Sequence, residues 1–377
     1  MPEYLDSNAT TRCDARVAAT VMRYLTDEFG NAGSRTHEWG ARAKKAVEHA
    51  RDQIADVGHV DPTGVVFTSG ATESNNLALL GLEAHGVATG RRHVIVTAVE
   101  HKAVLEPAGR LGERGFDVDV LPVDNGGYPS PDALAAALRD DTLAVSTMHV
   151  NNETGVELPL DDYSNILADS SAFWHVDAAQ SFGKRAGRQL ANDRIDLISV
   201  SAHKVYGPKG VGALLLRLRN GKRPPLAPLM VGGGQERGLR PGTVPVALVA
   251  GLGHAAALAA AEMDDRDAAA RKIRDRLLSA LTEAGAHING DPGRLVPHVV
   301  NTHLPGIDAE AFMLASRDLV AISNGSACTS ATVEPSHVLL AMGYDRDHTM
   351  SSVRISWDHD TDSGFTEGLI DRIAMLT

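Results

Sequence analysis

Over residues 65–217 the sequence alternates between short apolar runs and longer segments with helical spacing. Most of the apolar runs are continuous and rich in β-branched residues, which is typical of strands buried on both faces. Intervening stretches such as Glu73–Ala84 and Pro131–Leu138 have helical spacing. The pattern predicts an α/β domain with a mostly parallel seven-stranded sheet covered by helices. The predicted strands are Val65–Ser69, His93–Val99, Asp117–Pro122, Leu143–His149, Phe173–Asp177, Ile195–Ser201 and Val211–Leu216.

The pattern changes after residue 224. A glycine-rich loop at Gly232–Gly234 precedes a long alanine-rich helical stretch, Val246–Ala284, in which we expect a break. The C-terminal part predicts a smaller α+β domain that ends in a helix at Gly364–Leu376. We therefore expect a large domain over residues 16–254 and a small domain formed by residues 1–15 and 255–377.

Composition narrows the class of protein. The 377 residues are 43% hydrophobic and 22% charged, which is ordinary for a globular protein. No apolar run approaches the roughly 20 residues that span a bilayer, and the N-terminus lacks a signal pattern, so we expect a cytoplasmic protein without a membrane segment. The net charge of −12 argues against direct nucleic-acid binding. With only Cys13 and Cys328, a disulfide framework is excluded.

Polar residues follow five of the predicted strands. Ligands of open α/β sheets bind at the carboxyl ends of the strands, so these positions are candidates for a site. The polar groups there are Ser69-Gly70-Ala71-Thr72, Glu100-His101, Asn151-Asn152, Asp177 with Gln180, and Ser201-Ala202-His203-Lys204. Backbone N–H groups at Ala71 and Thr72, where a helix begins, suit an anion, although a plain capping turn explains them too.

Asp177 and Lys204 suggest a particular cofactor. A carboxylate at the end of a buried strand suits a protonated pyridine nitrogen, and a lysine beside a sheet suits Schiff-base chemistry. A helix cap and a solvated lysine are the alternatives for each residue alone. Together with the anion site at Thr72, they predict pyridoxal 5'-phosphate.

Two further residue types bear on the chemistry. His101 either meets the cofactor ring or is structural, and the other strand-end histidines, His149, His175 and His203, lack the tight spacing of a metal site. Cys328 lies in a stretch of small residues, 323–330, that indicates an exposed loop. Its thiol is either a sulfur acceptor or an inert small side chain.

Nine motifs in order resemble the cysteine desulfurase family, which is related to class V aminotransferases and has the fold-type-I pyridoxal-phosphate architecture. The resemblance covers nearly the whole chain. The motifs include Leu5–Thr11, Phe29–Ser34, Thr68–Asn76, Glu100–Val104, Met148–Gly155, His175–Ser181, Ser201–Gly210, Gly232–Pro245 and Gly325–Pro335, followed by Ser351–Arg354.

The resemblance implies a role for each matching residue. Lys204 would form the Schiff base, and Asp177, Gln180 and Asn152 would contact the cofactor. His101 would stack on the cofactor ring and handle protons. Substrate L-cysteine would be held by Arg354 and Asn152 with help from Asn31, and Cys328 would take its sulfur as a persulfide. The family is homodimeric. The phosphate would be bound by Ala71, Thr72, Ser201 and His203, with Thr243 from the second subunit.

One departure concerns the sulfur acceptor. Relatives that serve iron–sulfur scaffolds carry Leu-Gly-Arg where this chain has Trp357-Asp358-His359. The Phe29–His37 segment is more similar to desulfurases that serve DNA phosphorothioation. We therefore expect the acceptor to belong to either pathway. A selenocysteine lyase, a class V aminotransferase and a catalytically silent sulfur-transfer scaffold are the alternatives.

Overall fold

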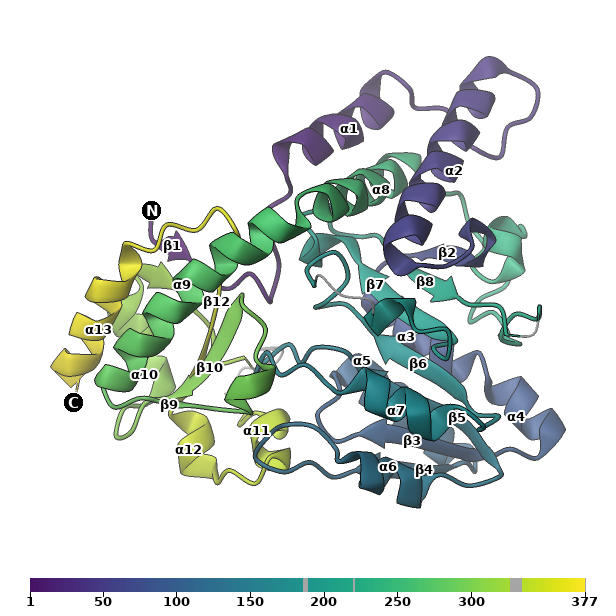
Figure 1. The fold of residues 1–377 in the computed structure, drawn as a ribbon. Coiled ribbons are helices and arrows are strands. Elements are labelled where there is room, and N and C mark those ends of the chain that lie inside the picture. Colours follow the sequence, from purple (N-terminus) through teal and green to yellow (C-terminus); the bar gives the residue numbers. More distant parts are fainter. Residues whose placement is uncertain (186–188, 220, 326–333, 377) are drawn as a thin grey trace.

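The computed structural model describes residues 1–185, 189–219, 221–325 and 334–376. Figure 1 shows a larger unit built on one sheet and a smaller unit that carries both termini. The strands of the larger unit are β2 (Val65–Thr68), β3 (His93–Thr97), β4 (Asp117–Leu121), β5 (Thr142–Met148), β6 (Phe173–Asp177), β7 (Leu197–Ser201) and β8 (Gly212–Leu216). Its helices are α1 (Ala15–Thr26), α2 (Glu38–Gly58), α3 (Ala71–Leu80), α4 (Glu83–Thr89), α5 (Lys102–Glu113), α6 (Pro131–Ala137), α7 (Leu160–Leu167) and α8 (Val246–Ala261).

The seven strands form one sheet in the order β2-β8-β7-β6-β5-β3-β4. Only β8 runs antiparallel to its neighbours, so the carboxyl ends of the other six strands share one edge. The predicted fold class is confirmed. Each predicted strand lies within a residue or two of an observed one.

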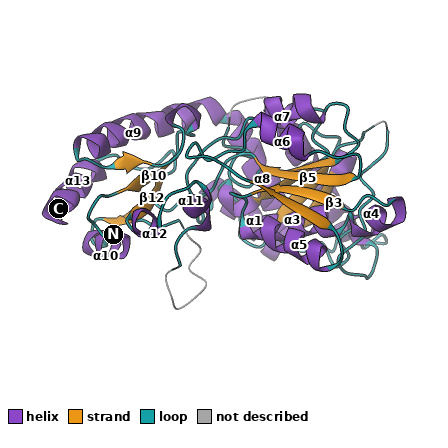
Figure 2. Ribbon diagram, turned by 90° about the horizontal axis from the view of Figure 1, so that it is seen from below, coloured by secondary structure: helices purple, strands orange, loops and turns teal. Residues whose placement is uncertain are grey.

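Helices cover both faces of this sheet, as Figure 2 shows. Buried residues of α2, α7 and α8 pack with one face around Trp174, and those of α3 and α5 pack with the other face around Val94. This double burial explains why the strands are continuous apolar runs.

The predicted helix Glu73–Ala84 is wrong in one respect, because α3 ends at Leu80 and α4 begins at Glu83. The break lies at Gly81, whose carbonyl accepts a hydrogen bond from the amide of Ala227 (2.8 Å). Glycine is also a poor helix former. Apolar spacing alone therefore did not reveal the interruption.

The smaller unit has its own core. Buried residues from Leu5 to Ile373 pack around Phe312 and Trp357. Its elements are β1 (Glu3–Tyr4), α9 (Met263–Glu283), β9 (His287–Ile288), β10 (Val299–His303), α10 (Ala309–Ser316), β11 (Val320–Ala321), α11 (His337–Ala341), α12 (Arg346–Met350), β12 (Ser352–Ser356) and α13 (Phe365–Leu376).

The long helical stretch breaks at Glu262, as predicted, and α8 and α9 meet at 73°. The whole of α8 packs with α1 and α2, so the predicted domain boundary at residue 254 falls within α8. Two separate cores support the predicted division of the chain, which we retain as a proposal. Within the described ranges, no single helix is long and apolar enough to cross a membrane, and α8 with α9 meets that criterion only as a bent pair.

Candidate active site

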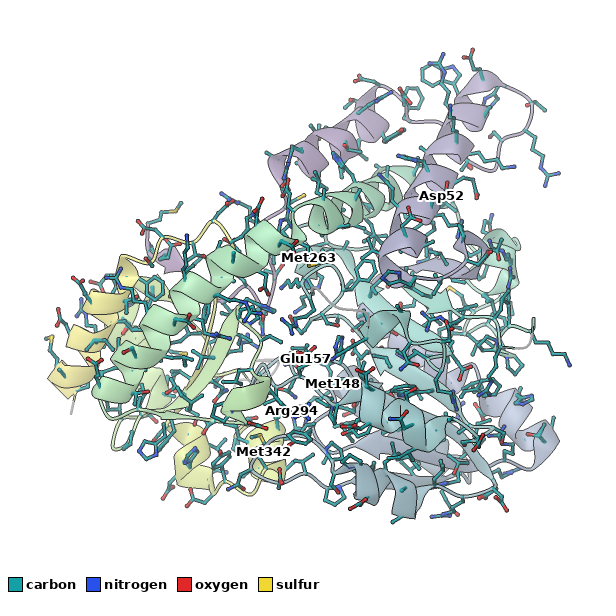
Figure 3. The ribbon with its side chains drawn as sticks, in the orientation of Figure 1. Asp52, Met148, Glu157, Met263, Arg294 and Met342 are labelled. Atoms are coloured by element: carbon teal, nitrogen blue, oxygen red, sulfur yellow. The ribbon has the colours of Figure 1, made fainter. Side chains whose placement is uncertain are left out.

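A cavity of about 940 Å³ opens at the shared carboxyl edge of the sheet, facing the smaller unit. Met148, labelled in Figure 3, lies at the end of β5 and contributes to its wall. The cavity brings together most of the predicted site residues. These are Ala71, Thr72, His101, Asn152, Asp177, Gln180, Ser201, His203, Lys204 and Arg354.

One end of the cavity is suited to an anion. The turn between β2 and α3 presents the start of α3, with Ala71 and Thr72 in the wall. Gly70 has a φ of 155° and a ψ of −179°, a conformation that is essentially limited to glycine, and a Cβ there would point towards Ser201 Oγ at 3.7 Å. The amide groups and hydroxyls at this end are hydrogen-bond donors for a phosphate.

His203 closes the same end. Its Nδ1 lies 3.1 Å from Thr10 Oγ1. Burial lowers the pKa of His203 to about 4, and the nearby Lys204 and Lys209 add to the effect. The ring is therefore uncharged at neutral pH, so an anion bound beside it would meet an N–H group rather than a positive charge.

Asp177 lies deeper in the cavity. Its Oδ2 accepts a hydrogen bond from Asn75 Nδ2 (2.7 Å), and its Oδ1 accepts one from the amide of Ala179 (2.9 Å). Gln180 Nε2 donates to the carbonyl of Asn8 (2.9 Å). The buried Oε1 of Gln180 and Oδ1 of Asn75 have no hydrogen-bond partner among the described residues, so acceptors remain for a bound group.

Lys204 ends a short 3₁₀ turn, Ala202–Lys204, directly after β7. Its Nζ donates hydrogen bonds to the carbonyls of Asn8 and Ala9. Burial lowers the pKa of Lys204 to about 7, with further lowering by Lys184 and Arg354 against the opposing charges of Asp6 and Asp177. Near neutral pH much of this amine is uncharged and hence nucleophilic.

His101 is the N-cap of α5, where its Nδ1 accepts a hydrogen bond from the amide of Ala103 (3.0 Å). Burial lowers the pKa of His101; the Asp177 carboxylate opposes this effect and Lys204 reinforces it. The preceding residue, Glu100, is fully buried, and burial raises its pKa well above the usual range, with the Asp177 charge as a second cause. His101 is thus uncharged at neutral pH, and because its Nδ1 accepts from the Ala103 amide, its other ring nitrogen, Nε2, carries the proton.

Arg354, on β12 of the smaller unit, lines the cavity on the side that this unit supplies. Its guanidinium donates to Asp6 Oδ1 (2.6 Å) and to the carbonyl of Asn152 (3.0 Å), and its buried Nε has no partner among the described residues. A substrate carboxylate at Arg354 would therefore share the guanidinium with Asp6.

Cys328 falls outside the described residues, but the borders of its segment are defined. On one side, Ser323 pairs with Arg354 through both backbone amides, and Ser323 to Gly325 line the cavity. On the other side, Ser336 Oγ donates to Glu153 Oε2 (2.5 Å) and His337 Nε2 donates to the carbonyl of Glu100 (2.9 Å).

Two predicted residues lie elsewhere. Asn31 and Thr243 are exposed and are not part of this cavity. The Oδ1 of Asn31 accepts from the amide of Gly33 (2.8 Å). Their roles in binding remain predictions.

Sequence reasoning assigned no role to three residues of the site, Asp6, Asn8 and Asn75. Asp6 contacts Arg354, and Asn75 contacts Asp177. Asn8 contacts both Lys204 and Gln180. Asp6 and Asn8 belong to the Leu5–Thr11 motif, which was the one available signal. Asn75 lies one helical turn beyond Ala71 on α3, and so it faces the same cavity.

The strand-end histidines do not form a metal site. His175 is buried between Ser146 Oγ (2.7 Å) and Ser199 Oγ (2.9 Å). No group of three or more histidine, cysteine, aspartate or glutamate side chains within the described ranges is arranged to hold a metal ion.

The residues present fit pyridoxal phosphate. A turn suited to an anion, a buried carboxylate and a poorly solvated amine face one cavity, whose volume is within the range of small-molecule sites. When bound, this cofactor acts as an electron sink for negative charge that develops on a substrate carbon.

Comparison with known proteins agrees with this chemistry. The family described as aminotransferase class-V matches residues 3–363. Cysteine desulfurase IscS of Shewanella loihica is 44% identical over 359 residues, which cover 94% of this chain and 88% of the relative.

Two solved structures are similar over nearly the whole chain. DndA from Streptomyces lividans has 49% identity and a TM-score of 0.83, with 94% of this chain and 99% of that chain covered. SspA in complex with cysteine has 33% identity and a TM-score of 0.83, with 96% and 100% covered. This chain therefore belongs to the class V aminotransferase family and, within it, to the cysteine desulfurases, which are pyridoxal phosphate enzymes.

Proposed function

We propose that this protein removes sulfur from L-cysteine, releases L-alanine and holds the sulfur as a persulfide on Cys328. The observation that carries the proposal is the anchoring of the Cys328 segment. One border pairs with Arg354, which is in the wall of the cavity that contains Lys204. The other border is held by Glu153 and Glu100, which directly adjoin the wall residues Asn152 and His101 in the chain. Cys328 is the third residue after Gly325, so chain connectivity limits its distance from the cavity.

The bonds and protons balance. The Cys328 thiolate attacks the substrate sulfur, an S–S bond forms, and the carbon–sulfur bond breaks. Its electron pair remains on carbon, which takes up a proton to give the methyl group of alanine. No external oxidant or reductant is needed, because the oxidised sulfur and the reduced carbon come from the same substrate.

The chain's own residues have distinct tasks in this reaction. Arg354 binds the substrate carboxylate, since a guanidinium donates two parallel hydrogen bonds, and Asn152 lies beside it. His101, uncharged at neutral pH and with its Nδ1 held by the Ala103 amide, donates its Nε2 proton and takes it back. Lys204 supplies the amine that holds the cofactor, and Asp177 supplies the negative charge for the pyridine nitrogen.

The sulfur acceptor is a further part of the proposal. We propose an acceptor protein of the DNA phosphorothioation machinery or an iron–sulfur scaffold. The 49% identity to DndA, against 44% to the IscS relative, favours the first pathway. The net charge of −12 supports contact with a basic protein partner rather than with DNA itself. We propose that this contact takes place in the cytoplasm.

The test compares wild type, Lys204→Ala and Cys328→Ser by visible absorbance and by alanine released from L-cysteine. We expect a cofactor band and alanine from wild type. Lys204→Ala should lose the lysine-linked band, and Cys328→Ser should keep the band but form no alanine.

Other outcomes would identify the alternatives. Alanine from Cys328→Ser would indicate a lyase that needs no persulfide. Consumption of a keto acid would indicate an aminotransferase, and exclusive use of selenocysteine would indicate a selenocysteine lyase. No cofactor band in wild type would leave a silent sulfur-transfer scaffold.

A further inference from the structure

Residues 232–243 form a loop, here called the arm, that leaves the sheet domain before α8. It contains two consecutive non-glycine residues with left-handed backbone, Glu236 (φ 45°) and Arg237 (φ 60°). Such conformations are costly and persist only where surrounding contacts hold them. Gln235 Oε1 accepts from the amide of Gly242 (2.8 Å), which closes the arm on itself.

A buried ion pair fixes the base of the arm. Glu236 accepts hydrogen bonds from Arg51 (2.8 and 3.1 Å) and from the amide of Phe67 on β2 (2.9 Å). The side chains of Arg51 and Glu236 are only 6% and 5% exposed, and the Arg51 guanidinium also lies 4.7 Å from the centre of the Phe67 ring. The arm is therefore held against β2, which leads into the anion-binding turn.

A second ion pair reaches that turn directly. Arg240 Nε donates to Glu73 Oε1 (3.0 Å), and Glu73 Oε2 accepts from the amide of Ser69 (2.7 Å). Glu73 is in the first turn of α3, next to Thr72, and Ser69 is in the wall of the cavity. Arg240, Glu73 and Ser69 thus connect the arm to the phosphate end of the site.

The charge of Glu73 requires compensation. A carboxylate beside an anion site repels a phosphate, and its side chain is only 13% exposed, so water screens it weakly. Burial by itself would raise the pKa of Glu73, but the hydrogen bonds from Ser69 and Arg240 lower it, so the group is ionised. Arg240 is the cation paired with it.

We propose that Arg240 is a positioning residue for the phosphate of the cofactor, acting through Glu73. It neutralises Glu73 and thereby allows Glu73 to orient the Ser69–Thr72 turn without repelling the phosphate. This inference rests on the proposed site, and it adds a residue that does not touch the cofactor itself.

The experiment measures equilibrium binding of pyridoxal phosphate and of pyridoxal, which lacks the phosphate, to the full-length protein. Arg240→Met should weaken binding of pyridoxal phosphate about tenfold and leave binding of pyridoxal unchanged, because only the phosphate meets the uncompensated charge. Arg240→Lys should restore most of the loss. Arg110→Met, which removes an exposed pair with Glu113 on α5, is the matched control and should change neither affinity.

A second variant separates charge from folding. Adding Glu73→Gln to Arg240→Met removes the repelling carboxylate, and the phosphate-specific affinity should recover. Equal losses for both ligands, or a loss that Glu73→Gln does not reverse, would overturn the proposal and assign Arg240 a purely structural role. Failure of the wild type to bind pyridoxal phosphate more tightly than pyridoxal would instead contradict the phosphate site itself.

Discussion

At the scale of single residues, the amine of Lys204 has an unusual environment. Two cations, Lys184 and Arg354, and two carboxylates, Asp6 and Asp177, surround it at a desolvated position. A lysine in water is almost entirely protonated at neutral pH and is then no nucleophile. Desolvation is the largest cause of the change, the two cations add to it and the two carboxylates oppose it, and the pKa of Lys204 falls to about 7.

This pKa predicts how the cofactor-free protein captures pyridoxal phosphate at different pH values. Only the uncharged amine reacts, so the rate of capture should rise with pH through a midpoint near 7. The rate should then become constant before the pH reaches the ordinary pKa of a lysine, about 10. Stopped-flow absorbance across roughly pH 6 to 10 measures the profile. A rate that keeps rising towards a midpoint near 10 would contradict the environment described for Lys204.

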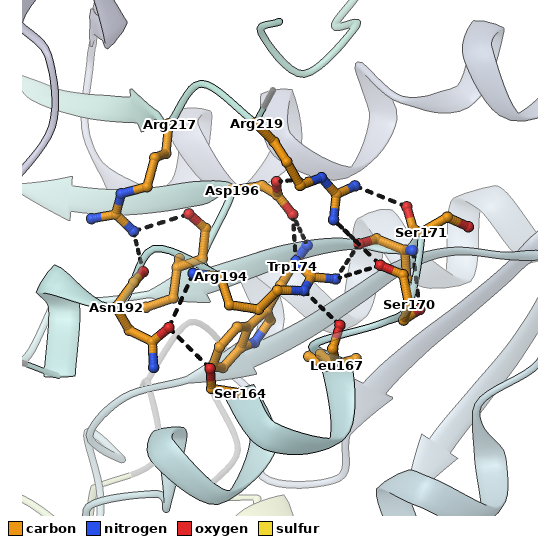
Figure 4. Close-up of polar contacts among 12 residues, drawn as sticks. Ser164, Leu167, Ser170, Ser171, Trp174, Asn192, Arg194, Asp196, Arg217 and Arg219 are labelled. Carbon is orange, nitrogen blue, oxygen red and sulfur yellow. Dashed lines mark hydrogen bonds and ion pairs between the residues drawn. The ribbon is translucent and has the colours of Figure 1, made fainter. Parts of the chain in front are cut away.

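At the scale of elements, the amino ends of β6 and β7 are joined by a cluster of ion pairs, shown in Figure 4. Asp196, just before β7, accepts from the amide of Trp174 (2.8 Å) and from Arg194 (2.8 Å), and Arg219 lies 3.4 Å away. Asp196 is 2% exposed. The cluster lies at the end of the sheet opposite the cavity, so it acts on stability rather than on chemistry.

Asp196→Asn should therefore destabilise the protein without altering the site. The substitution leaves the buried Arg194 without its carboxylate, which typically lowers the free energy of unfolding by about 3 kcal/mol. Urea denaturation measures the change, and the cofactor band should remain as in wild type. Asp318→Asn, in an exposed pair with Arg372, should cost less than about 1 kcal/mol. Loss of the cofactor band in natively folded Asp196→Asn would contradict the separation of roles.

Most elements of the sheet domain could be predicted from the sequence because strands buried on both faces leave a continuous apolar signal. Their carboxyl ends then located Thr72, Asp177 and Lys204 together, since parallel strands end at one edge. The break at Gly81 was missed, because it depends on a hydrogen bond with Ala227, far along the chain.

Contacts between residues that are far apart in the sequence could not be predicted either. Asp6 and Arg354 are 348 residues apart in the chain, and they form an ion pair because the N-terminal segment bridges to the end of β12 at Ser356. Polar residues outside strand ends carry no local signal for such contacts. The position of the Cys328 thiol lies outside the described residues, so its role remains a prediction.

At the scale of the whole molecule, Thr243 bears on assembly. It ends the arm, is exposed, and is not among the residues that line the cavity of its own chain. If Thr243 binds a phosphate, as the resemblance to the desulfurases implies, that phosphate is in the cavity of the other subunit, and we propose a homodimer in which each arm reaches the neighbouring cavity.

Mixed dimers test this arrangement. A dimer of one Lys204→Ala subunit and one Thr243→Ala subunit should keep one fully intact site and about half of wild-type activity, if Thr243 acts on the partner. A dimer of one wild-type subunit and one subunit with both substitutions should have no intact site. Equal activity of the two mixed dimers would show that Thr243 does not act across the interface.

We have proposed that sulfur passes from L-cysteine to Cys328 within this cavity. The most direct measurement is mass spectrometry of the protein after one turnover with L-cysteine, together with the amount of alanine released. We predict that the peptide containing Cys328 gains one sulfur atom, in an amount equal to the alanine, and that Cys13 gains none. Alanine release without added sulfur on Cys328 would contradict the account.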